Sequence, residues 1–132
     1  MIEGQCACGK VRYRYYGDIT EISMCHCSQC RASQGSAYAA VCPVDASRLT
    51  FDGESNIKTF QSSENKVRAF CKHCGSPLYS AKTELPNIKR LRVGTVTTPF
   101  TCDNQFHIYT DSKASWHTIT DGYTQHKNNK PL

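Results

Sequence analysis

The sequence contains no long apolar run and no segment that resembles a secretory signal. Nowhere does it approach the ~18 consecutive apolar residues that a membrane-spanning helix needs. Its first residues, Met1 to Gln5, carry neither the basic region nor the apolar region of a secretory signal peptide. We therefore expect a cytoplasmic protein without a membrane span.

Hydrophobic residues are also few for a chain of this length. Its 132 residues give room for one domain. The hydrophobic 39% includes nine cysteines, and without them the share falls to about 32%, against about 45–50% in typical domains. Such a small core leaves little margin over the conformational entropy that folding costs. We expect another stabilising element to help to close the fold.

The nine cysteines can supply that element. Their odd number and their gaps of one or two residues, in a chain without a secretory signal, favour metal binding over disulfides. Disulfides remain the alternative, because a mature secreted chain stripped of its signal would look the same. Seven thiolates holding two Zn²⁺ would also lower the formal net charge from +5 to about +2. The basic balance alone therefore does not indicate a nucleic-acid partner.

Short segments of alternating, β-branched and aromatic residues predict strands over 11–16, 38–42, 49–51, 57–60, 66–70, 78–80, 88–96 and 106–109. We expect Pro43 to end the second of these, and Asp52-Gly53 to form a hairpin turn between the third and fourth. Helix is limited to single turns near 28–33 and 45–49. This pattern predicts an all-β sandwich or barrel-like domain over 1–124, followed by a poorly ordered polar tail over 125–132.

Seven of the cysteines fall into three clusters: Cys6-x-Cys8, Cys25-x-Cys27-x-x-Cys30 and Cys71-x-x-Cys74. A structural zinc takes four tetrahedral ligands, usually as two pairs from separate turns. The first and third clusters are each followed by a glycine, Gly9 or Gly75, which permits a positive φ and lets backbone N–H groups face the sulfurs. The middle cluster is followed by Arg31 instead. We therefore predict a closed zinc site on the first and third clusters.

The middle cluster has three cysteines, which do not complete a tetrahedron. Three protein ligands and an open position are the pattern of a reactive zinc site. An open site would hold a substrate thiol in its deprotonated form. The alternative is a second closed site, completed by one of four residues: His26, Cys42, Cys102 or His107.

With these clusters in place, the sequence resembles the glutathione-dependent formaldehyde-activating enzyme family, which also includes centromere protein V. The matching stretches are Gly4-x-Cys6-x-Cys8-Gly9-x-Val11-x-Tyr13, Cys25-His26-Cys27-Ser28-x-Cys30-Arg31 with Gly35, Phe60-x-Ser62, Arg68-x-Phe70-Cys71-x-x-Cys74-Gly75-Ser76, and His107-Ile108 with Trp116. The resemblance covers residues 4 to about 117 and includes seven cysteines with their flanking glycines.

The resemblance implies an all-β, Mss4-like fold with split zinc-ribbon knuckles. It implies two zinc ions per chain, a structural one on Cys6, Cys8, Cys71 and Cys74 and a second one on Cys25, Cys27 and Cys30. The implied activity is that of a carbon–sulfur lyase or synthase. Its type reaction joins a small thiol, glutathione, to formaldehyde and gives S-hydroxymethylglutathione.

Three further residues are candidates for the chemistry. His107 is a candidate proton shuttle, because an imidazole titrates near neutral pH. Arg31 and Arg68 could bind a substrate carboxylate bidentately. The alternative function is a non-catalytic zinc-stabilised module that binds protein or nucleic acid through the basic stretch Lys89-Arg90-x-Arg92. Nucleic acid is the weaker option, because neither a zinc-finger helix nor a pattern of alternating aromatic and basic residues is present.

Overall fold

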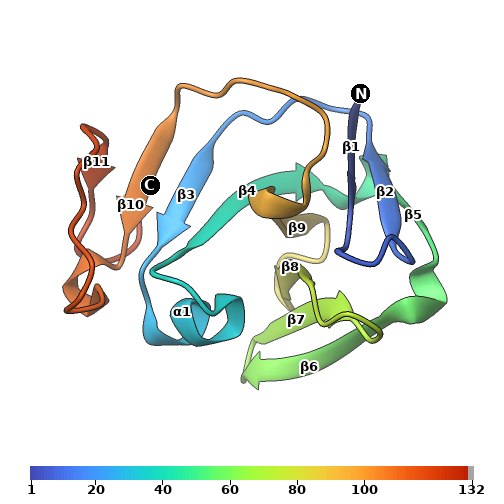
Figure 1. Cartoon of the computed structure of the whole chain (residues 1–132), viewed down its shortest axis with the longest axis horizontal. Coiled ribbons are helices and arrows are strands. Elements are labelled where there is room, and N and C mark those ends of the chain that lie inside the picture. Colours follow the sequence, from blue (N-terminus) through green and yellow to red (C-terminus); the bar gives the residue numbers. More distant parts are fainter. Residues whose placement is uncertain (131–132) are drawn as a thin grey trace.

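Short strands form two sheets in the computed structural model, which describes residues 1–130. The smaller sheet is antiparallel, with the order β1 (Ile2–Gln5), β2 (Arg12–Tyr15) and β5 (Leu49–Asp52). The larger sheet has the order β11-β10-β3-β4-β9-β8-β7-β6 and is antiparallel except where β10 pairs with β3 and β11 (Figure 1). Its strands are β3 (Ile22–Cys25), β4 (Ala39–Asp45), β6 (Ile57–Ser63), β7 (Lys66–Cys71), β8 (Pro77–Lys82), β9 (Ile88–Arg92), β10 (Gln105–Ile108) and β11 (Thr124–Gln125). The predicted all-β class is confirmed.

Helical structure is confined to short segments. The single α-helix of the described residues is α1 (Ser28–Gln34). Four 3₁₀ turns span Ala46–Arg48, Glu54–Asn56, Val93–Thr95 and Thr110–Ser112. None of these helices, within residues 1–130, is long and apolar enough to cross a membrane.

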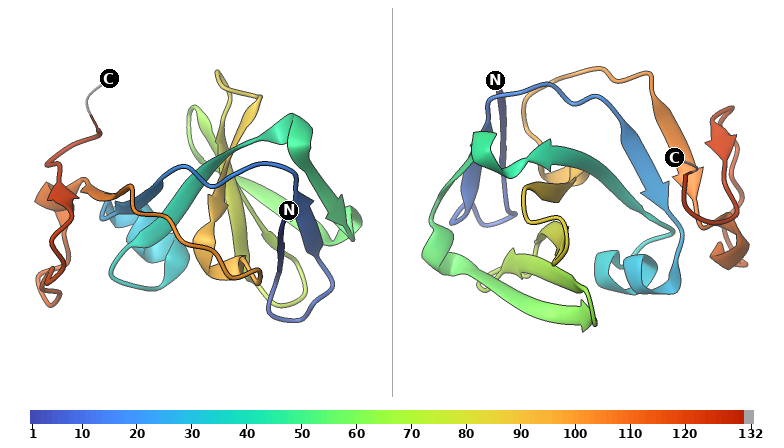
Figure 2. Two further views of the ribbon diagram at one scale, coloured as in Figure 1. Left: turned by 90° about the horizontal axis from the view of Figure 1, so that it is seen from above. Right: turned by 180° about the vertical axis from the view of Figure 1, so that it is seen from behind.

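The main core lies between the smaller sheet and one face of the larger sheet. Alternation along β2 turns Tyr13 and Tyr15 inward and leaves Arg12 and Arg14 exposed, as a half-buried strand requires. The two tyrosines pack with side chains from β4, β5 and β9, namely Cys42, Val44, Leu49 and Leu91. Figure 2 shows the smaller sheet at the opposite end of the molecule from β10 and β11.

The helix α1 lies near the ends of β3 and β4 and beside the β6–β7 hairpin (Figure 1). Arg68 of β7 ties the hairpin to the helix, because its Nη1 donates to Ser33 Oγ at 3.0 Å. Cys25 of β3 and Cys30 of α1 share a second core with Ala39, Val41, Phe106 and Ile108. The helix therefore fixes the middle cysteine cluster against the larger sheet.

Three strand predictions were wrong. The strand predicted over 88–96 ends at Arg92, and a 3₁₀ turn over Val93–Thr95 follows it. The second strand does not end at Pro43, because β4 runs to Asp45 and Pro43 pairs with Arg90 of β9. Pairing of β4 with β3 ends at Val41, so the missing N–H of Pro43 removes no bond from that ladder. The predicted hairpin across Asp52-Gly53 is also absent. There β5 pairs with β2 and β6 with β7, and a 3₁₀ turn at Glu54–Asn56 carries the chain from one sheet to the other.

The segment predicted as a poorly ordered tail makes specific contacts over its described part, 125–130. The strand β11 pairs with β10, and the N–H of Tyr109 donates to the Asn128 carbonyl at 2.9 Å. The Lys130 ammonium lies 3.8 Å from a carboxylate oxygen of Glu21. Residues 131 and 132 lie outside the described part of the chain.

Candidate metal centres

The sulfurs of Cys6, Cys8, Cys71 and Cys74 lie within 4.8 Å of one another. The Cys6 and Cys8 sulfurs are 3.6 Å apart, and the Cys8 and Cys71 sulfurs are 3.8 Å apart. Around a tetrahedral metal with bonds of about 2.3 Å, two sulfurs are about 3.8 Å apart. All nine cysteines lie in the described residues and are free thiols. This four-cysteine group can therefore hold a metal ion without rearrangement.

The turns that carry these cysteines have the geometry that their glycines predict. Gly9 and Gly75 both adopt φ 77°, a left-handed conformation that residues with a Cβ rarely take. The turns direct N–H groups at sulfur: Val11 N–H donates to Cys6 Sγ at 3.3 Å and His73 N–H to Cys71 Sγ at 3.4 Å. The Ser76 hydroxyl, which bonds the Cys74 sulfur at 3.2 Å, helps to lower the pKa of Cys74 to about 5. Each of these contacts favours the thiolate form that a metal requires.

This group also joins the two sheets. Cys6 and Cys8 lie in the β1–β2 turn, whereas Cys71 ends β7 and Cys74 lies in the turn to β8. Cys6 and Cys71 are buried in a third small core with Val11 and Leu78. A metal ion held here would cross-link the smaller sheet to the larger one.

The sulfurs of Cys25, Cys27 and Cys30 form a second group within 4.8 Å. Cys25 is the last residue of β3, Cys27 is the N-cap of α1, and Cys30 lies inside the helix. The sulfur of Cys27 accepts a hydrogen bond from the backbone N–H of Cys30 at 3.3 Å. No His, Cys, Asp or Glu of residues 1–130 adds a fourth ligand atom to this group. The geometry of the described residues thus leaves one tetrahedral position free of protein.

The four residues considered as a fourth ligand lie elsewhere. The His26 side chain bonds the ring of His107, and neither ring belongs to the group of ligands. Cys42 is fully buried in the main core, where burial raises its pKa to about 12. The sulfur of Cys102 faces the carbonyl of Asn104.

Arg68 supplies positive charge beside the three-cysteine group. Its Nη2 lies 3.6 Å from Cys30 Sγ. Hydrogen bonds from Cys25 and Cys27, followed by the one from Arg68, lower the pKa of Cys30 far below that of a free thiol. Bonds to Cys27 and Cys30 raise the pKa of Cys25 instead. The guanidinium of Arg68 therefore favours the thiolate form of Cys30.

A cavity of about 240 Å³ opens beside the three sulfurs. Its walls come from β3, β4, α1, β7, β8, β9 and β10. The cysteines Cys25, Cys27 and Cys30 line it together with five basic side chains, Lys66, Arg68, Lys82, Arg90 and Arg92. The three sulfurs thus share a cavity with an excess of positively charged side chains.

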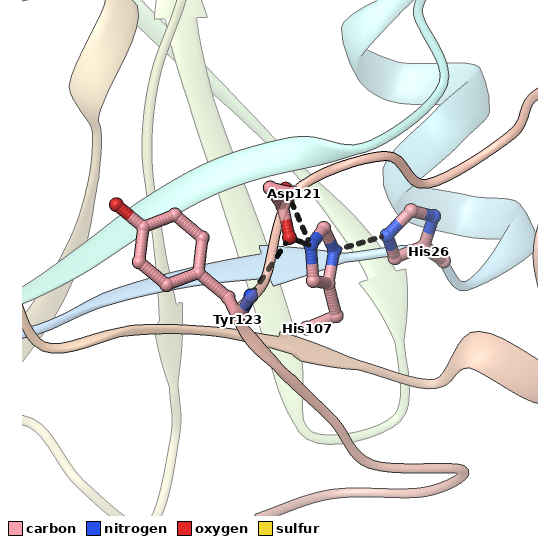
Figure 3. Close-up of polar contacts among 4 residues, drawn as sticks. All are labelled: His26, His107, Asp121 and Tyr123. Carbon is pink, nitrogen blue, oxygen red and sulfur yellow. Dashed lines mark hydrogen bonds and ion pairs between the residues drawn. The ribbon is translucent and has the colours of Figure 1, made fainter.

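A hydrogen-bonded chain of three side chains leads from the buried rings of His26 and His107 to the partly exposed carboxylate of Asp121 (Figure 3). His107 Nε2 lies 3.0 Å from both carboxylate oxygens of Asp121, and His107 Nδ1 lies 2.8 Å from His26 Nε2. Desolvation opposes ionisation of Asp121, but hydrogen bonds from His107 and from the Tyr123 N–H lower its pKa. Burial lowers the pKa of His26 to about 4, so its ring is neutral at pH 7. A carboxylate at Asp121 fixes the proton of His107 on Nε2, and His26 Nε2 then donates to His107 Nδ1.

The predicted catalytic and substrate residues separate into two places. Arg68 lines the cavity, and its side chain is only 4% exposed. His107 is 1% exposed and does not line it. Arg31 also lies outside the lining residues, and its Nε donates to the His26 carbonyl at 3.2 Å. The structure therefore joins Arg31 and His107 through His26, and it places Arg68 at the cavity.

Several residues of this region were missed by the sequence analysis. Asp121 had no recognisable signal, because its link to His107 depends on the tertiary fold. Lys66 did have one, since basic residues recur at every second position in β7, and alternate positions share one face of a strand. Arg92 was named only in the basic stretch of the alternative binding module, and the structure places it at the cavity.

Comparisons with known proteins show the family of this chain. The sequence model of the glutathione-dependent formaldehyde-activating enzyme family matches residues 1–112. An uncharacterized lyase of Schizosaccharomyces pombe is 31% identical over 85 residues, which are 64% of this chain and 61% of that protein. A Rhodobacter sphaeroides protein of known crystal structure shares the fold with a TM-score of 0.63 at 20% identity, over 94% of this chain and 98% of that one. The chain belongs to the glutathione-dependent formaldehyde-activating enzyme family.

Proposed function

We propose that the chain is a zinc-dependent carbon–sulfur lyase or synthase that acts on small thiol adducts, as in the reaction of glutathione with formaldehyde. The observation that carries the proposal is the group of Cys25, Cys27 and Cys30 on the wall of a cavity. Three thiolate ligands with an open position suit a reactive zinc. The complete group of four cysteines suits a structural zinc, so two zinc ions are proposed per chain. The family and the lyase name of the yeast relative support this assignment.

Zinc in the three-cysteine group would supply Lewis acidity and lower the pKa of a thiol in the cavity. The reaction forms a bond between the thiol sulfur and the aldehyde carbon, and the thiol proton passes to the aldehyde oxygen. The reverse reaction breaks this bond and returns the proton. Arg68 stabilises the charge of Cys30 and places a guanidinium where an anionic part of the substrate can bind.

The role of His107 as a proton shuttle has less support. Its ring does not line the cavity, and neither does the buried ring of His26, to which it is hydrogen-bonded, so a further proton carrier would be needed between these rings and the substrate. Asp121 orients His107 in the way that a carboxylate orients a catalytic imidazole. Arg31 is better suited to hold the loop between Cys25 and Cys27 than to bind substrate, because its guanidinium bonds the backbone of that loop.

The alternative of a nucleic-acid-binding module has less support. The basic stretch of β9 does not form a continuous exposed surface, because its residues alternate between the two faces of the sheet. Arg90 and Arg92 line the cavity, whereas the Lys89 ammonium lies over the rings of Phe51 and Tyr79. A strand whose charges are divided in this way is poorly suited to follow a phosphate backbone.

The test is exchange between a thiol and its hydroxymethyl adduct, measured by NMR with ¹³C-formaldehyde and the zinc-loaded protein. Exchange should be faster with the protein than without it. The Cys27→Ala variant should lose this acceleration while it keeps the four-cysteine zinc and its fold. Cys102→Ser, which alters a thiol outside both groups, should retain full acceleration. Equal exchange rates with and without the wild-type protein, over a panel of small thiols, would refute the proposed function.

A further inference from the structure

The cavity beside the three-cysteine group has the composition of an anion site. Residues that pair directly across neighbouring strands lie on the same face of the larger sheet. Between β7 and β8, Lys66 pairs with Lys82 and Arg68 with Ser80. Ser80 also pairs with Arg90 of β9, and Arg92 of β9 pairs with Val41 of β4. All of these side chains line the cavity. Strand register therefore brings together five cations that are far apart in sequence.

No acidic side chain lines this cavity. Within residues 1–130, none of its five cations forms an ion pair with a carboxylate. A metal on three thiolates carries a net charge of about −1, which balances only one of the five. The cavity thus keeps a large excess of positive charge even with the metal in place.

Two of the cations are held where an unmatched charge is most costly. Arg68 is 4% exposed and Arg92 is 2% exposed. In the described part of the chain, the Nε of each guanidinium has no hydrogen-bond partner. Desolvation lowers the pKa of Arg92 to about 10, which still leaves it charged at pH 7. Arg68 already lies beside the Cys30 sulfur, whereas Arg92 donates only to neutral oxygens, the Ser80 hydroxyl and the Arg90 carbonyl. Buried charges are normally paired, so the guanidinium of Arg92, with that of Arg68 beside the same cavity, is consistent with an anionic ligand.

The size of the cavity limits that ligand. The cavity that contains the three sulfurs has a volume of about 240 Å³, below the range of roughly 300–1,000 Å³ typical of pockets for drug-sized molecules. Arg68 and Arg92 also line a second cavity of about 460 Å³, but none of the three cysteines does, so a ligand whose sulfur faces the three-cysteine group occupies the smaller cavity. A guanidinium matches a carboxylate through two parallel hydrogen bonds. We propose that the substrate thiol is a short mercapto-carboxylic acid, whose carboxylate binds Arg68 and Arg92 while its sulfur faces the three-cysteine group. The sulfur part of this proposal rests on the proposed function, and the carboxylate part can be tested separately.

The first test compares three thiols of similar size and different charge: 3-mercaptopropionate, 2-mercaptoethanol and cysteamine. Binding is followed by the absorption of protein loaded with cobalt in place of zinc. The acid should bind at least about tenfold more tightly than the alcohol, and the amine should bind most weakly. The carboxylate of 3-mercaptopropionate raises the pKa of its thiol, so this acid has a smaller thiolate fraction than the alcohol or the amine. Tighter binding of the acid therefore cannot be explained by its thiolate fraction. Glutathione should bind less tightly than 3-mercaptopropionate.

Substitution then assigns the preference to a residue. Arg92→Gln should reduce the ratio of acid to alcohol affinity about tenfold, while Arg14→Gln on the exposed face of β2 should leave it unchanged. If Arg92→Gln does not fold, Lys82→Gln at a half-buried position of the cavity tests the same ratio. The wild-type comparison of thiols needs no variant at all.

A second measurement separates the two proposals. Propionate, which has no thiol, should bind the zinc-loaded protein in calorimetry and should protect its arginines from phenylglyoxal. Thiols that bind without regard to charge would overturn the carboxylate site and leave the proposed function intact. Propionate binding together with a cobalt spectrum that no thiol changes would support the carboxylate site and refute the proposed function. Tighter binding of glutathione than of 3-mercaptopropionate would refute the inferred size of the substrate.

Discussion

Replacing Cys74 by serine removes one of the four sulfurs that join the smaller sheet to the larger one. Cys74 is exposed, so the substitution leaves no cavity and buries no new hydroxyl group. Cys71 is less suitable for this test because it is fully buried, and a serine there would add a polar group to the core. Any loss of stability in Cys74→Ser can therefore be attributed to the metal site.

The expected loss is as large as the stability of the domain. Zinc bound by such sites contributes about 10–16 kcal/mol, whereas a whole domain is stable by about 5–15 kcal/mol. The core around the site is small: two of its four buried residues, Cys6 and Cys71, are candidate ligands themselves. Val11 and Leu78 remain, with Phe51, Ile57 and Tyr79 partly buried against them. We expect Cys74→Ser to be insoluble or unfolded.

Metal content, circular dichroism and thermal unfolding of the purified variants measure this effect. Cys102→Ser should behave as the wild type, because its sulfur belongs to neither group. Cys27→Ala should remain folded with one zinc fewer. A soluble Cys74→Ser protein that unfolds cooperatively near the wild-type temperature, with one zinc fewer, would refute the structural role of this site.

Three further outcomes are expected. A mild chelator should remove the metal of the three-cysteine group first and leave the circular dichroism spectrum unchanged, because that group lacks a fourth protein ligand; simultaneous loss of both metals with unfolding would contradict this. Asp121→Ala should lower the free energy of unfolding in urea by about 1 kcal/mol, because it removes the acceptor of the His107 N–H at a partly exposed position where water can replace it in part, and Asp121→Asn should cost less. If neither variant is less stable than the wild type, the hydrogen bond to His107 contributes nothing. Gly75→Ala should cost about 1–2 kcal/mol in the same assay, because Gly75 has φ 77°, whereas an unchanged stability would mean that the turn relaxes.

The features that could be predicted from sequence are those that local patterns determine. Short segments rich in β-branched and aromatic residues located most strands, because that preference belongs to the segment itself, and β2 also shows the alternation of buried and exposed residues. The glycines after Cys8 and Cys74 indicated two similar turns, and both turns have the same positive φ. The hairpin prediction failed because pairing is not local: β5 lies beside β2, which is some forty residues earlier in the sequence.

The cavity could not be predicted for a related reason. In a strand of an antiparallel sheet, a charged residue at every second position normally indicates a face that is open to water. Lys66-x-Arg68 and Arg90-x-Arg92 fit this pattern in β7 and β9, so their positions alone indicate an ordinary solvated surface. In the structure, α1 covers the face that carries these basic residues. Residues of α1, β3 and β10 complete the walls of the cavity. The burial of Arg68 and Arg92 therefore depends on segments outside their own strands, and the charge pattern acquires its chemical meaning only once the fold brings it beside the three cysteines.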